Sequence, residues 1–345
     1  MSAVIWWLTL TLIAVSSAVI DGCLPSDRAA LLAFRAALRE PYLGIFNTWT
    51  GSDCCHWYGV SCDPKTYRVD EINLAGESDD LIFRQAHRSG YMTGNISHAI
   101  CRLKYLSSIT ITDWKGITGD IPRCISSLPF LQILDLTGNR ISSPIPGNIG
   151  RLRWLTFLSL ADNLIYGRIP PSITKLTNLM HLDLRQNQLS GRIPRQFGQL
   201  KMLSRALLSH NRLAGWIPHS ISEIYRLADF DLSSNQLSGP IPDWLGKMEV
   251  LSTLNLDGNK ISGTIPGSLL NSRILNLNLS RNALNGNIPD SFGPRSYFIT
   301  LDLSYNNLEG TIPKSLASAG YIGSMDVSHN HIRGQIPPGS PFDHL

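Results

Sequence analysis

The sequence predicts an α/β repeat protein, a solenoid in which each stacked coil adds one short strand to a parallel sheet. An Ile-Pro pair recurs in one frame ten times, from Ile121-Pro122 to Ile336-Pro337. A fixed period of this length indicates a solenoid, because one unit alone cannot bury its apolar face. An Asn recurs in the same frame in steps of 24 residues, with one step of 23, at Asn139, Asn163, Asn187, Asn211, Asn235, Asn259, Asn282, Asn306 and Asn330.

One repeat, LDLRQNQLSGRIP, shows why the pattern folds in this way. The alternation around Leu182 and Leu184 predicts a short strand with two inward side chains and an acid facing outward. Asn187 follows where the chain bends, and a buried Asn can pair backbone groups that the bend leaves free. We therefore expect the Asn side chains to stack as a ladder. Gly191 permits a tight backbone, and Pro194 starts the return segment. The return segment packs from the far side through Phe197, Leu200 and Leu203.

Eleven parallel strands are predicted along the solenoid, about 4.8 Å apart. The first two strands match the repeat at fewer positions, because Glu77 and Trp114 stand where the other coils have the Asn. A helical repeat is a weak alternative, since a Gly and a Pro in nearly every unit would break long helices. The strands are centred on residues 72–74, 109–111, 134–136, 158–160, 182–184, 206–208, 230–232, 254–256, 277–279, 301–303 and 325–327.

The repeat LxxLxxLxLxxNxLxGxIP resembles the leucine-rich repeat in its plant extracellular variant, over about residues 69 to 345. The block before it resembles the N-terminal cap of that family, with ALLAFRAAL at 30–38 and DCCHWYGVSC at 53–62. Departures are few and comprise Ser97, Ser143 and Ala206. Within the family the chain looks most similar to a secreted member named for DNA-damage repair and toleration, and next to polygalacturonase inhibitors. Receptor-kinase ectodomains share the repeat.

The resemblance implies a right-handed solenoid with a concave parallel sheet, a helical or 3-10 convex side and a disulfide-linked N-terminal cap. It also implies that Cys23 pairs with Cys54 and Cys55 with Cys62, which leaves Cys101 for Cys124. An even number of cysteines behind a signal peptide favours disulfides. A metal site around Cys54, Cys55 and His56 is the alternative, although the spacing is unusual for zinc. Related proteins end in a C-terminal cap with a further cysteine pair, which this sequence lacks, so we expect a truncated array.

Three regions are expected along the chain. Residues 1–20 carry no charge and predict a secretory signal peptide, with an uncleaved membrane anchor as the alternative. Residues 21–68 form the cap, in which a helix over 27–38 covers the first coil. Residues 69–345 form about eleven coils without a C-terminal cap. Residues 78–93 lengthen the first repeat and predict a surface loop. The expected location is secreted, in the extracellular space or cell wall, or membrane-anchored through the N-terminal segment.

The charge distribution and the glycosylation motifs limit the classes of partner that we expect. The formal net charge is +4 and no run of Lys or Arg occurs, so the sequence lacks the clustered positive charge of polyanion binders. We expect no nucleic-acid partner and only weak attraction to an acidic wall polysaccharide. Two sequons predict glycans at Asn95 and Asn278.

Catalysis is not expected, and neither is a cofactor or a metal. The best candidates for acid–base chemistry are Asp302 and Asp326, whose carboxyls on adjacent coils could stand about 5 Å apart, near the spacing of a retaining glycosidase. Outward polar residues on strands produce such columns automatically, and an open sheet excludes little water. A column of solvated acids is therefore the preferred interpretation.

Recognition is the remaining function, and solenoids use their concave face for it. We predict a secreted binding protein for a protein, peptide or cell-wall ligand in defence or stress response, such as a pectin-degrading enzyme or a receptor-kinase ectodomain. The alternative is an accessory or truncated ectodomain of a signalling receptor. The predicted contact residues on coils three to seven, with three apolar side chains expected to face water, are Ile133, Asp135, Phe157, Ser159, His181, Asp183, Arg185, Arg205, Leu207, Asp229 and Asp231.

Overall fold

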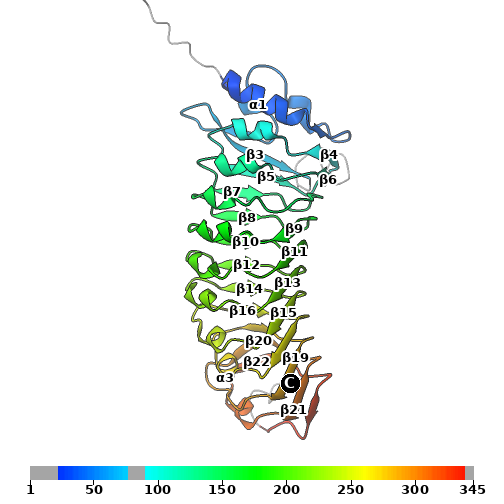
Figure 1. Cartoon of the computed structure of the whole chain (residues 1–345), viewed down its shortest axis with the longest axis vertical. Helices are drawn as coiled ribbons and strands as arrows, with labels where there is room; N and C mark the ends of the chain where they lie inside the picture. The colour runs from blue at the N-terminus through cyan, green and yellow to red at the C-terminus, as the bar shows by residue number, and fades with distance from the viewer. Residues whose placement is uncertain (1–21, 77–89, 339–345) are drawn as a thin grey trace, which may run out of the picture.

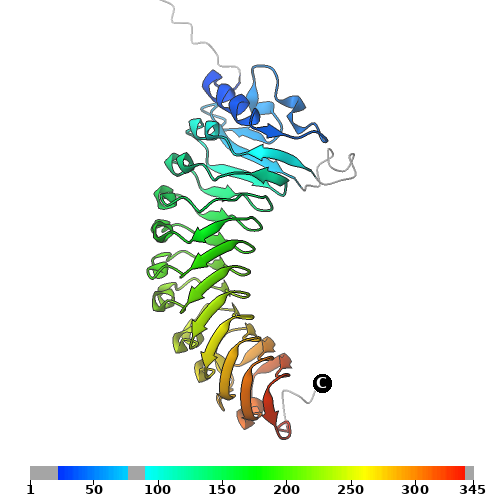
Figure 2. The same ribbon diagram turned by 45° about the vertical axis from the view of Figure 1, so that its right-hand side comes forward.

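The structure, a computed structural model, describes residues 22–76 and 90–338 and shows one curved stack of coils (Figure 1). Figure 2 shows the short helical segments along the outside of the bend. The predicted signal peptide and most of the predicted loop at 78–93 lie outside the described residues. Within the described ranges, no helix has both the length and the apolar character needed to cross a membrane.

The main sheet has twelve strands in the described chain, and its eleven parallel members confirm the predicted solenoid. The register is regular: Leu182 pairs with Leu158 on one side and with Ala206 on the other. Antiparallel β2 (Val60–Cys62) closes the N-terminal edge. The parallel strands are β3 (Val69–Ala75), β5 (Ser108–Thr112), β7 (Ile133–Asp135), β8 (Phe157–Ser159), β10 (His181–Asp183), β12 (Arg205–Leu207), β14 (Asp229–Asp231), β16 (Thr253–Asn255), β18 (Asn276–Asn278), β20 (Tyr297–Asp302) and β22 (Tyr321–Asp326).

A second parallel sheet follows the Asn of each coil, and the sequence analysis did not predict it. Gly191 was expected to permit a tight backbone, and the segment that ends at this residue runs extended before the chain turns. Gly191 has φ +80°, and a Cβ there would lie 3.0 Å from Cγ of Arg168 on the preceding coil. The strands are β9 (Tyr166–Arg168), β11 (Gln188–Gly191), β13 (Arg212–Gly215), β15 (Gln236–Gly239), β17 (Lys260–Gly263), β19 (Ala283–Asn287), β21 (Asn307–Thr311) and β23 (His331–Arg333).

Short helical turns form the convex side, and all but the first, which Ser97 precedes, start near the proline of an Ile-Pro pair. Pro170, with φ −67°, stands immediately before one of them, because its ring fixes the backbone for the turn. The convex segments are η3 (His98–Arg102), η4 (Arg123–Ser127), η5 (Ile149–Arg151), η6 (Pro171–Lys175), η7 (Phe197–Gln199), η8 (His219–Glu223), η9 (Asp243–Lys247), α3 (Gly267–Leu270) and η10 (Lys314–Ser318).

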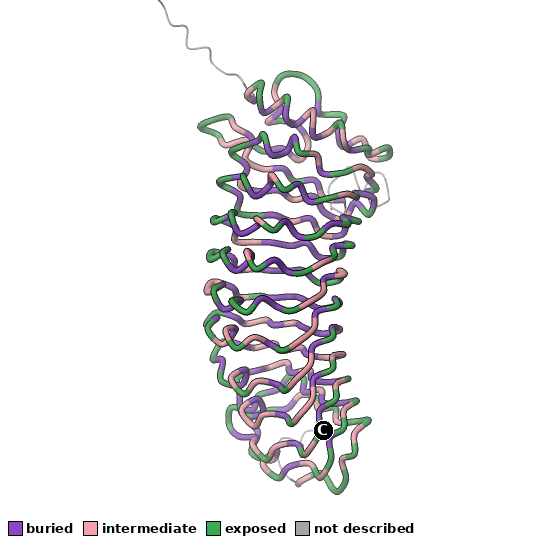
Figure 3. The backbone as a smooth tube through the Cα atoms, in the orientation of Figure 1, coloured by how far each residue is buried: buried purple, intermediate pink, exposed green. Residues whose placement is uncertain are grey.

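The apolar core runs through the whole stack between these layers (Figure 3). The predicted Asn ladder is present. Asn211 Nδ2 donates to the carbonyl of Leu184 on the preceding coil at 2.9 Å, and its Oδ1 accepts from the N–H of Leu189 at 2.9 Å. The residue before each Asn has positive φ, as His210 does at 52°. That conformation lets the carbonyl of His210 accept from the N–H of Asn187 at 3.1 Å.

The cap covers the first coil with α1 (Pro25–Arg35), η1 (Ile45–Thr48) and η2 (Cys54–His56). Asp27 on α1 is buried and accepts from Arg68 Nε at 2.8 Å, from Arg68 Nη2 at 2.9 Å and from the N–H of Val69 at 3.1 Å. This carboxylate therefore ties the cap to β3. A three-stranded sheet adds β1 (Leu38–Arg39), β4 (Met92–Asn95) and β6 (Lys115–Thr118).

The disulfides follow the pairing that the resemblance implied. Cys23 bonds Cys54, Cys55 bonds Cys62 and Cys101 bonds Cys124, with Cα–Cα distances of 5.2, 5.4 and 5.9 Å. The last pair links η3 to η4 on adjacent coils. The alternative metal site is not supported, because Cys54 and Cys55 are used in disulfides and His56 Nδ1 contacts Asp53 Oδ2 at 2.5 Å.

Candidate functional site

The first outward column of the main sheet forms a continuous row across five strands, which we call the concave ladder. Its members are partners in register from β7 to β14, namely Ile133, Phe157, His181, Arg205 and Asp229. Ile133 is 38% exposed and therefore presents apolar surface to water. The sheet places each of these side chains one strand spacing from the next, so a single ligand can contact all five.

Two pairwise contacts organise the concave ladder. The rings of Phe157 and His181 stack at 4.5 Å with an interplanar angle of 4°. Arg205 Nε contacts Asp229 Oδ2 at 2.9 Å. Burial against the sheet lowers the pKa of His181, and the nearby charges of Arg205 and Arg185 lower it further. The ladder therefore presents a flat stacked pair of rings at its centre, with an ion pair beside it.

The second outward column is far less accessible than the sequence predicted. Leu207 was expected to face water but is only 8% exposed, and Ser159 and Asp183 are 3% exposed. Asp183 lies between Ser159 and Leu207 in register, and side chains this close on adjacent strands cover one another. Burial raises the pKa of the Asp183 carboxyl. It meets the exposed Arg185 Nε at 3.1 Å, so Asp183 positions Arg185 and is not itself open to a ligand.

The outward acids are occupied by the turns that follow their strands. Asp135 Oδ1 accepts from the hydroxyl of Thr137 at 2.6 Å, and Asp231 Oδ1 accepts from that of Ser233 at 2.7 Å. Asp302 accepts from the hydroxyl of Ser304 at 2.7 Å. These carboxylates therefore have a structural role in addition to facing solvent, because each accepts a hydrogen bond from the turn where the chain leaves the sheet.

The candidate pair for glycosidase chemistry, Asp302 and Asp326, lies on neighbouring strands in register. The N–H of Ser328 donates to Asp326 at 2.8 Å, and this hydrogen bond lowers the pKa of Asp326. A general acid needs a raised pKa, so the environment of Asp326 favours the opposite protonation state. The described residues contain no group of three or more His, Cys, Asp or Glu arranged to hold a metal ion.

The predicted glycan acceptors lie in different settings. Asn95 is exposed at the end of β4. Asn278 is half-buried within the main sheet, and its Oδ1 accepts from the N–H and the hydroxyl of Ser280 at 3.0 and 2.7 Å.

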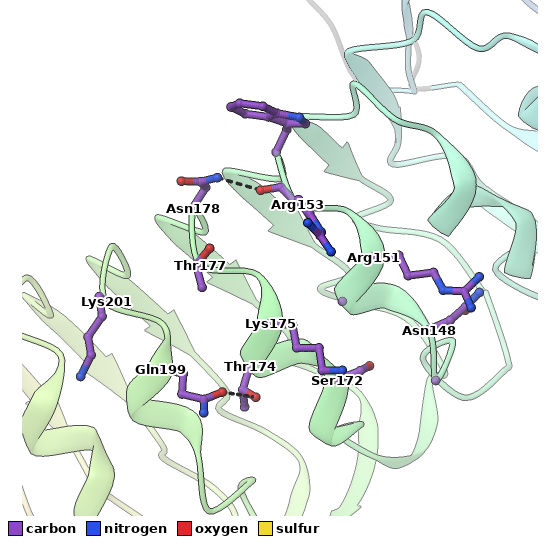
Figure 4. A pocket seen from close by; sticks show the side chains of 13 residues that line it. Asn148, Arg151, Arg153, Ser172, Thr174, Lys175, Thr177, Asn178, Gln199 and Lys201 are labelled. Carbon is purple, nitrogen blue, oxygen red and sulfur yellow. Dashed lines mark hydrogen bonds between the residues drawn. The ribbon is translucent and has the colours of Figure 1, made fainter.

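A groove with a volume of about 1160 Å³ lies on the convex side, away from the concave ladder. It runs beside η5 and η6 and carries four cationic side chains, Arg151, Arg153, Lys175 and Lys201. Figure 4 shows Lys201 near one end, Asn148 and Arg151 at the other, and Lys175 between them. We call this surface the basic groove.

The sequence analysis missed the basic groove because it looked for a run of Lys and Arg. In a solenoid, residues one period apart become neighbours. Arg151 and Lys175 are separated by 24 residues and Arg153 and Lys201 by twice that. The expectation that positive charge is not clustered was therefore wrong, and a search at the repeat period would have found the cluster.

Comparisons with known proteins agree with this architecture. A model described as Leucine rich repeat N-terminal domain matches residues 24–63. The model Leucine Rich Repeat matches residues 130–152, 178–200, 226–248, 250–272, 273–294 and 298–319.

Among curated relatives, the chain is 58% identical over 125 residues to the DNA damage-repair/toleration protein DRT100 of Arabidopsis thaliana, which covers 36% of this chain and 34% of that protein. It is 31% identical over 118 residues to a polygalacturonase inhibitor of Vitis vinifera, covering 34% and 31%. The matched regions thus span about a third of these two relatives.

Two solved structures are similar over most of the chain. A plant ice-binding protein is 29% identical with a TM-score of 0.72, covering 93% of this chain and 99% of that one. The ectodomain of the Arabidopsis thaliana receptor kinase GASSHO1/SCHENGEN3 is 30% identical with a TM-score of 0.80, covering 90% and 36%. The in-register coils, the Asn ladder, the N-terminal cap and these matches show that the chain belongs to the plant leucine-rich repeat proteins.

Proposed function

We propose that this protein is a secreted, non-catalytic binding protein that recognises a peptide or protein segment on the concave ladder. The observation that carries the proposal is the row from Ile133 to Asp229, in which the exposed Ile133 and the half-buried rings of Phe157 and His181 lie beside Arg205. Aromatic and Arg anchors in a polar surround are typical of binding hot spots. The shallow sheet suits an extended partner that lies along the row.

Two similar structures support a peptide or protein ligand. The GASSHO1/SCHENGEN3 ectodomain was solved in complex with CASPARIAN STRIP INTEGRITY FACTOR 2. The receptor kinase HAESA, 29% identical with a TM-score of 0.69, was solved with the peptide hormone IDA and the co-receptor SERK1. Two forms of the function follow for this chain. It binds a pectin-degrading enzyme as an inhibitor does, or it binds a peptide or receptor ectodomain as a signalling accessory.

The test compares which partners three forms of the tagged protein capture. Each form is incubated with plant apoplastic fluid and with the same fluid supplemented with a fungal polygalacturonase. The forms are wild type, Phe157→Ala with Arg205→Glu, and Thr253→Ala as a control in the same column outside the ladder. We expect a partner that wild type and Thr253→Ala retain and the double variant loses. A bound polygalacturonase supports the inhibitor form, and a peptide or ectodomain supports the signalling form. Equal capture by all three correctly folded proteins would place the binding site elsewhere.

The non-catalytic part of the proposal is tested separately. The hydroxyl of Ser304 and the N–H of Ser328 hold Asp302 and Asp326 at open strand ends. We expect no hydrolysis of pectic or other wall glycans above background. Turnover that disappears in Asp302→Asn would overturn this expectation.

Ice binding is a second candidate, favoured by the regularity of the C-terminal strands. From β16 to β22 the first outward column changes to short polar side chains, Thr253, Asn276, Thr300 and Ser324. Thr300 Oγ1 donates to Asn276 Oδ1 at 3.0 Å. Evenly spaced hydroxyl and amide groups can hold an ordered layer of water. Inhibition of ice recrystallisation that is lost in Thr300→Tyr but kept in Arg205→Glu would support this function, and no inhibition by wild type would exclude it.

A further inference from the structure

The positive charge of the protein is concentrated in its central coils. Residues 140–226 hold 12 of the 30 Lys and Arg but only 3 of the 26 Asp and Glu. The remaining residues carry 18 basic and 23 acidic side chains and are therefore net acidic. The modest net charge of +4 conceals this asymmetry. A basic centre between acidic ends concentrates its attraction for anions on one part of the surface.

The basic groove is where part of this charge converges. Its lining includes no Asp or Glu. Lys201 Nζ contacts Glu223 Oε2 at the edge of the groove at 2.7 Å. Among the described residues, no ion pair involves Arg151, Arg153 or Lys175. Unpaired cations on neighbouring coils repel one another, and a bound anion would relieve that repulsion.

The rest of the lining is suited to a hydroxylated ligand. Thr174 Oγ1 donates to Gln199 Oε1 at 3.0 Å, and Asn178 Nδ2 donates to the carbonyl of Arg153 at 2.7 Å (Figure 4). These contacts fix the two amides in place. Each amide keeps hydrogen-bonding capacity for a partner, because it has two donors and an acceptor with two lone pairs.

An exposed aromatic row leads into the groove. Trp154 lines it and is 61% exposed. Phe130 and Tyr105 stand at the equivalent positions of the two preceding coils, 49% and 42% exposed, with their rings 5.8 Å apart. The Arg68 guanidinium packs on the Tyr105 ring at 4.2 Å, whereas Phe130 and Trp154 leave about half or more of their surface open to solvent. Flat rings next to fixed hydrogen-bonding groups and cations make a surface for a sugar chain that carries acid groups.

We propose that the basic groove binds a carboxylated polysaccharide, a polyuronate chain, with Arg151, Arg153 and Lys175 at its carboxylates and Trp154 against a sugar ring. Nucleic acid would also use cations and aromatic rings. The three disulfides, however, indicate an oxidising compartment, which argues against nucleic acid as the ligand. This site is on the convex side and is independent of the concave ladder.

The test measures binding of a polygalacturonate oligosaccharide to the full chain by calorimetry at low and at high salt. Fully methyl-esterified oligosaccharide of the same length is the uncharged matched ligand, and a single-stranded DNA of similar charge is the competing polyanion. The variant is Arg151→Glu with Lys175→Glu. Its control is Lys260→Glu with Arg333→Glu, which makes the same charge change on exposed residues of the second sheet.

We expect wild type to bind polygalacturonate with an affinity that falls as salt rises, and to bind neither the esterified chain nor DNA comparably. The groove variant should lose about tenfold or more in affinity, whereas the control pair should change it by about twofold or less. Trp154→Ala should weaken binding and leave its salt dependence unchanged, because it removes contact area and no charge. Circular dichroism and denaturant unfolding confirm that each variant folds.

Three results would overturn the proposal: no binding by wild type, equal losses in the groove and control variants, or binding of DNA as tight as that of polygalacturonate. Equal binding of the esterified chain would also contradict it, because the carboxylates would then not be recognised. Failure here leaves the proposed function intact. Phe157→Ala should keep polygalacturonate binding while losing the concave partner, and the groove variant should do the reverse.

Discussion

The Asn ladder provides a sharp energetic test, because one of its members lacks a bond that the others make. Asn211 uses both ends of its amide. Its Nδ2 donates to the carbonyls of Leu184, Leu208 and Ser209 at 2.9, 3.3 and 3.1 Å, and its Oδ1 accepts from Leu189 N–H at 2.9 Å. Asn139 donates to three carbonyls in the same way, but its Oδ1 has no partner in the described structure.

The two substitutions Asn211→Ala and Asn139→Ala therefore differ by one buried backbone N–H left without an acceptor. Such a group costs about 1–3 kcal/mol. Both variants lose their bonds to the carbonyls, so each is destabilised. We expect Asn211→Ala to lower the free energy of unfolding by about 1–3 kcal/mol more than Asn139→Ala does. Both residues are buried, at 8% and 6% exposure, so their desolvation is similar.

Guanidinium unfolding followed by circular dichroism measures the difference, with Gln236→Ala as an exposed control that should change little. Hydrogen exchange locates the unpaired N–H. The amide of Leu189 should exchange faster than in wild type in Asn211→Ala and at the wild-type rate in Asn139→Ala. Solenoid coils couple mainly to their neighbours, so the local readout matters if unfolding is not two-state. Equal destabilisation by the two variants, or no change in exchange at Leu189, would refute the account of the ladder.

Three further predictions concern the disulfide between adjacent coils, the concave ladder and the glycans. Replacing Cys101 and Cys124 by Ala should lower the free energy of unfolding by about 2–4 kcal/mol in urea, and unchanged stability would contradict a structural role. The pKa of His181 is lowered from its ordinary value of 6.5, so the unfolded chain takes up this proton more readily and stability falls as pH drops through that value. The free energy of unfolding of His181→Gln should fall less than that of wild type between neutral and mildly acidic pH. Identical dependence of the two proteins on pH would contradict the lowered pKa of His181. Mass measurement before and after deglycosylation of plant-secreted protein should find glycans on Asn95 and Asn278, and bare Asn278 would leave the C-terminal half of the concave sheet open.

Much of the fold was predictable because the repeat reports on the core. Leu182 and Leu184 alternate because both side chains enter the core, and an Asn such as Asn187 pairs the backbone at the bend of nine coils, so the strands and the ladder follow from sequence. The second sheet was missed because its short segments, such as Gln188–Gly191, have a Gly at the end and read as a turn. Its pairing depends on the adjacent coil, where Leu189 meets Gly167, and not on local preference.

The candidate site was less predictable, because the direction in which a side chain points and its accessibility to solvent are different properties. The period of two correctly placed Leu207 and Asp183 on the outward side of the sheet. It could not show that they are covered there, since that depends on the size of side chains 24 residues away in each direction. Ile133 and Leu207 are both apolar residues on the outward side of their strands, in the first and the second outward column, yet one is 38% exposed and the other 8%. Accessibility along a solenoid must therefore be assessed by column across coils, because each outward residue has neighbours that a local window does not contain.

The same reasoning by column explains how one repeat can carry two independent surfaces. Each coil contributes one residue to the concave ladder and others to the convex side, and the apolar core separates the two. His181 and Lys175 are six residues apart in sequence, yet they lie in different columns on opposite sides of that core. A substitution in one column alters its neighbours at the repeat period and leaves the other column unchanged. The concave ladder and the basic groove can therefore differ in partner, salt dependence and pH dependence, and single-site variants can separate them.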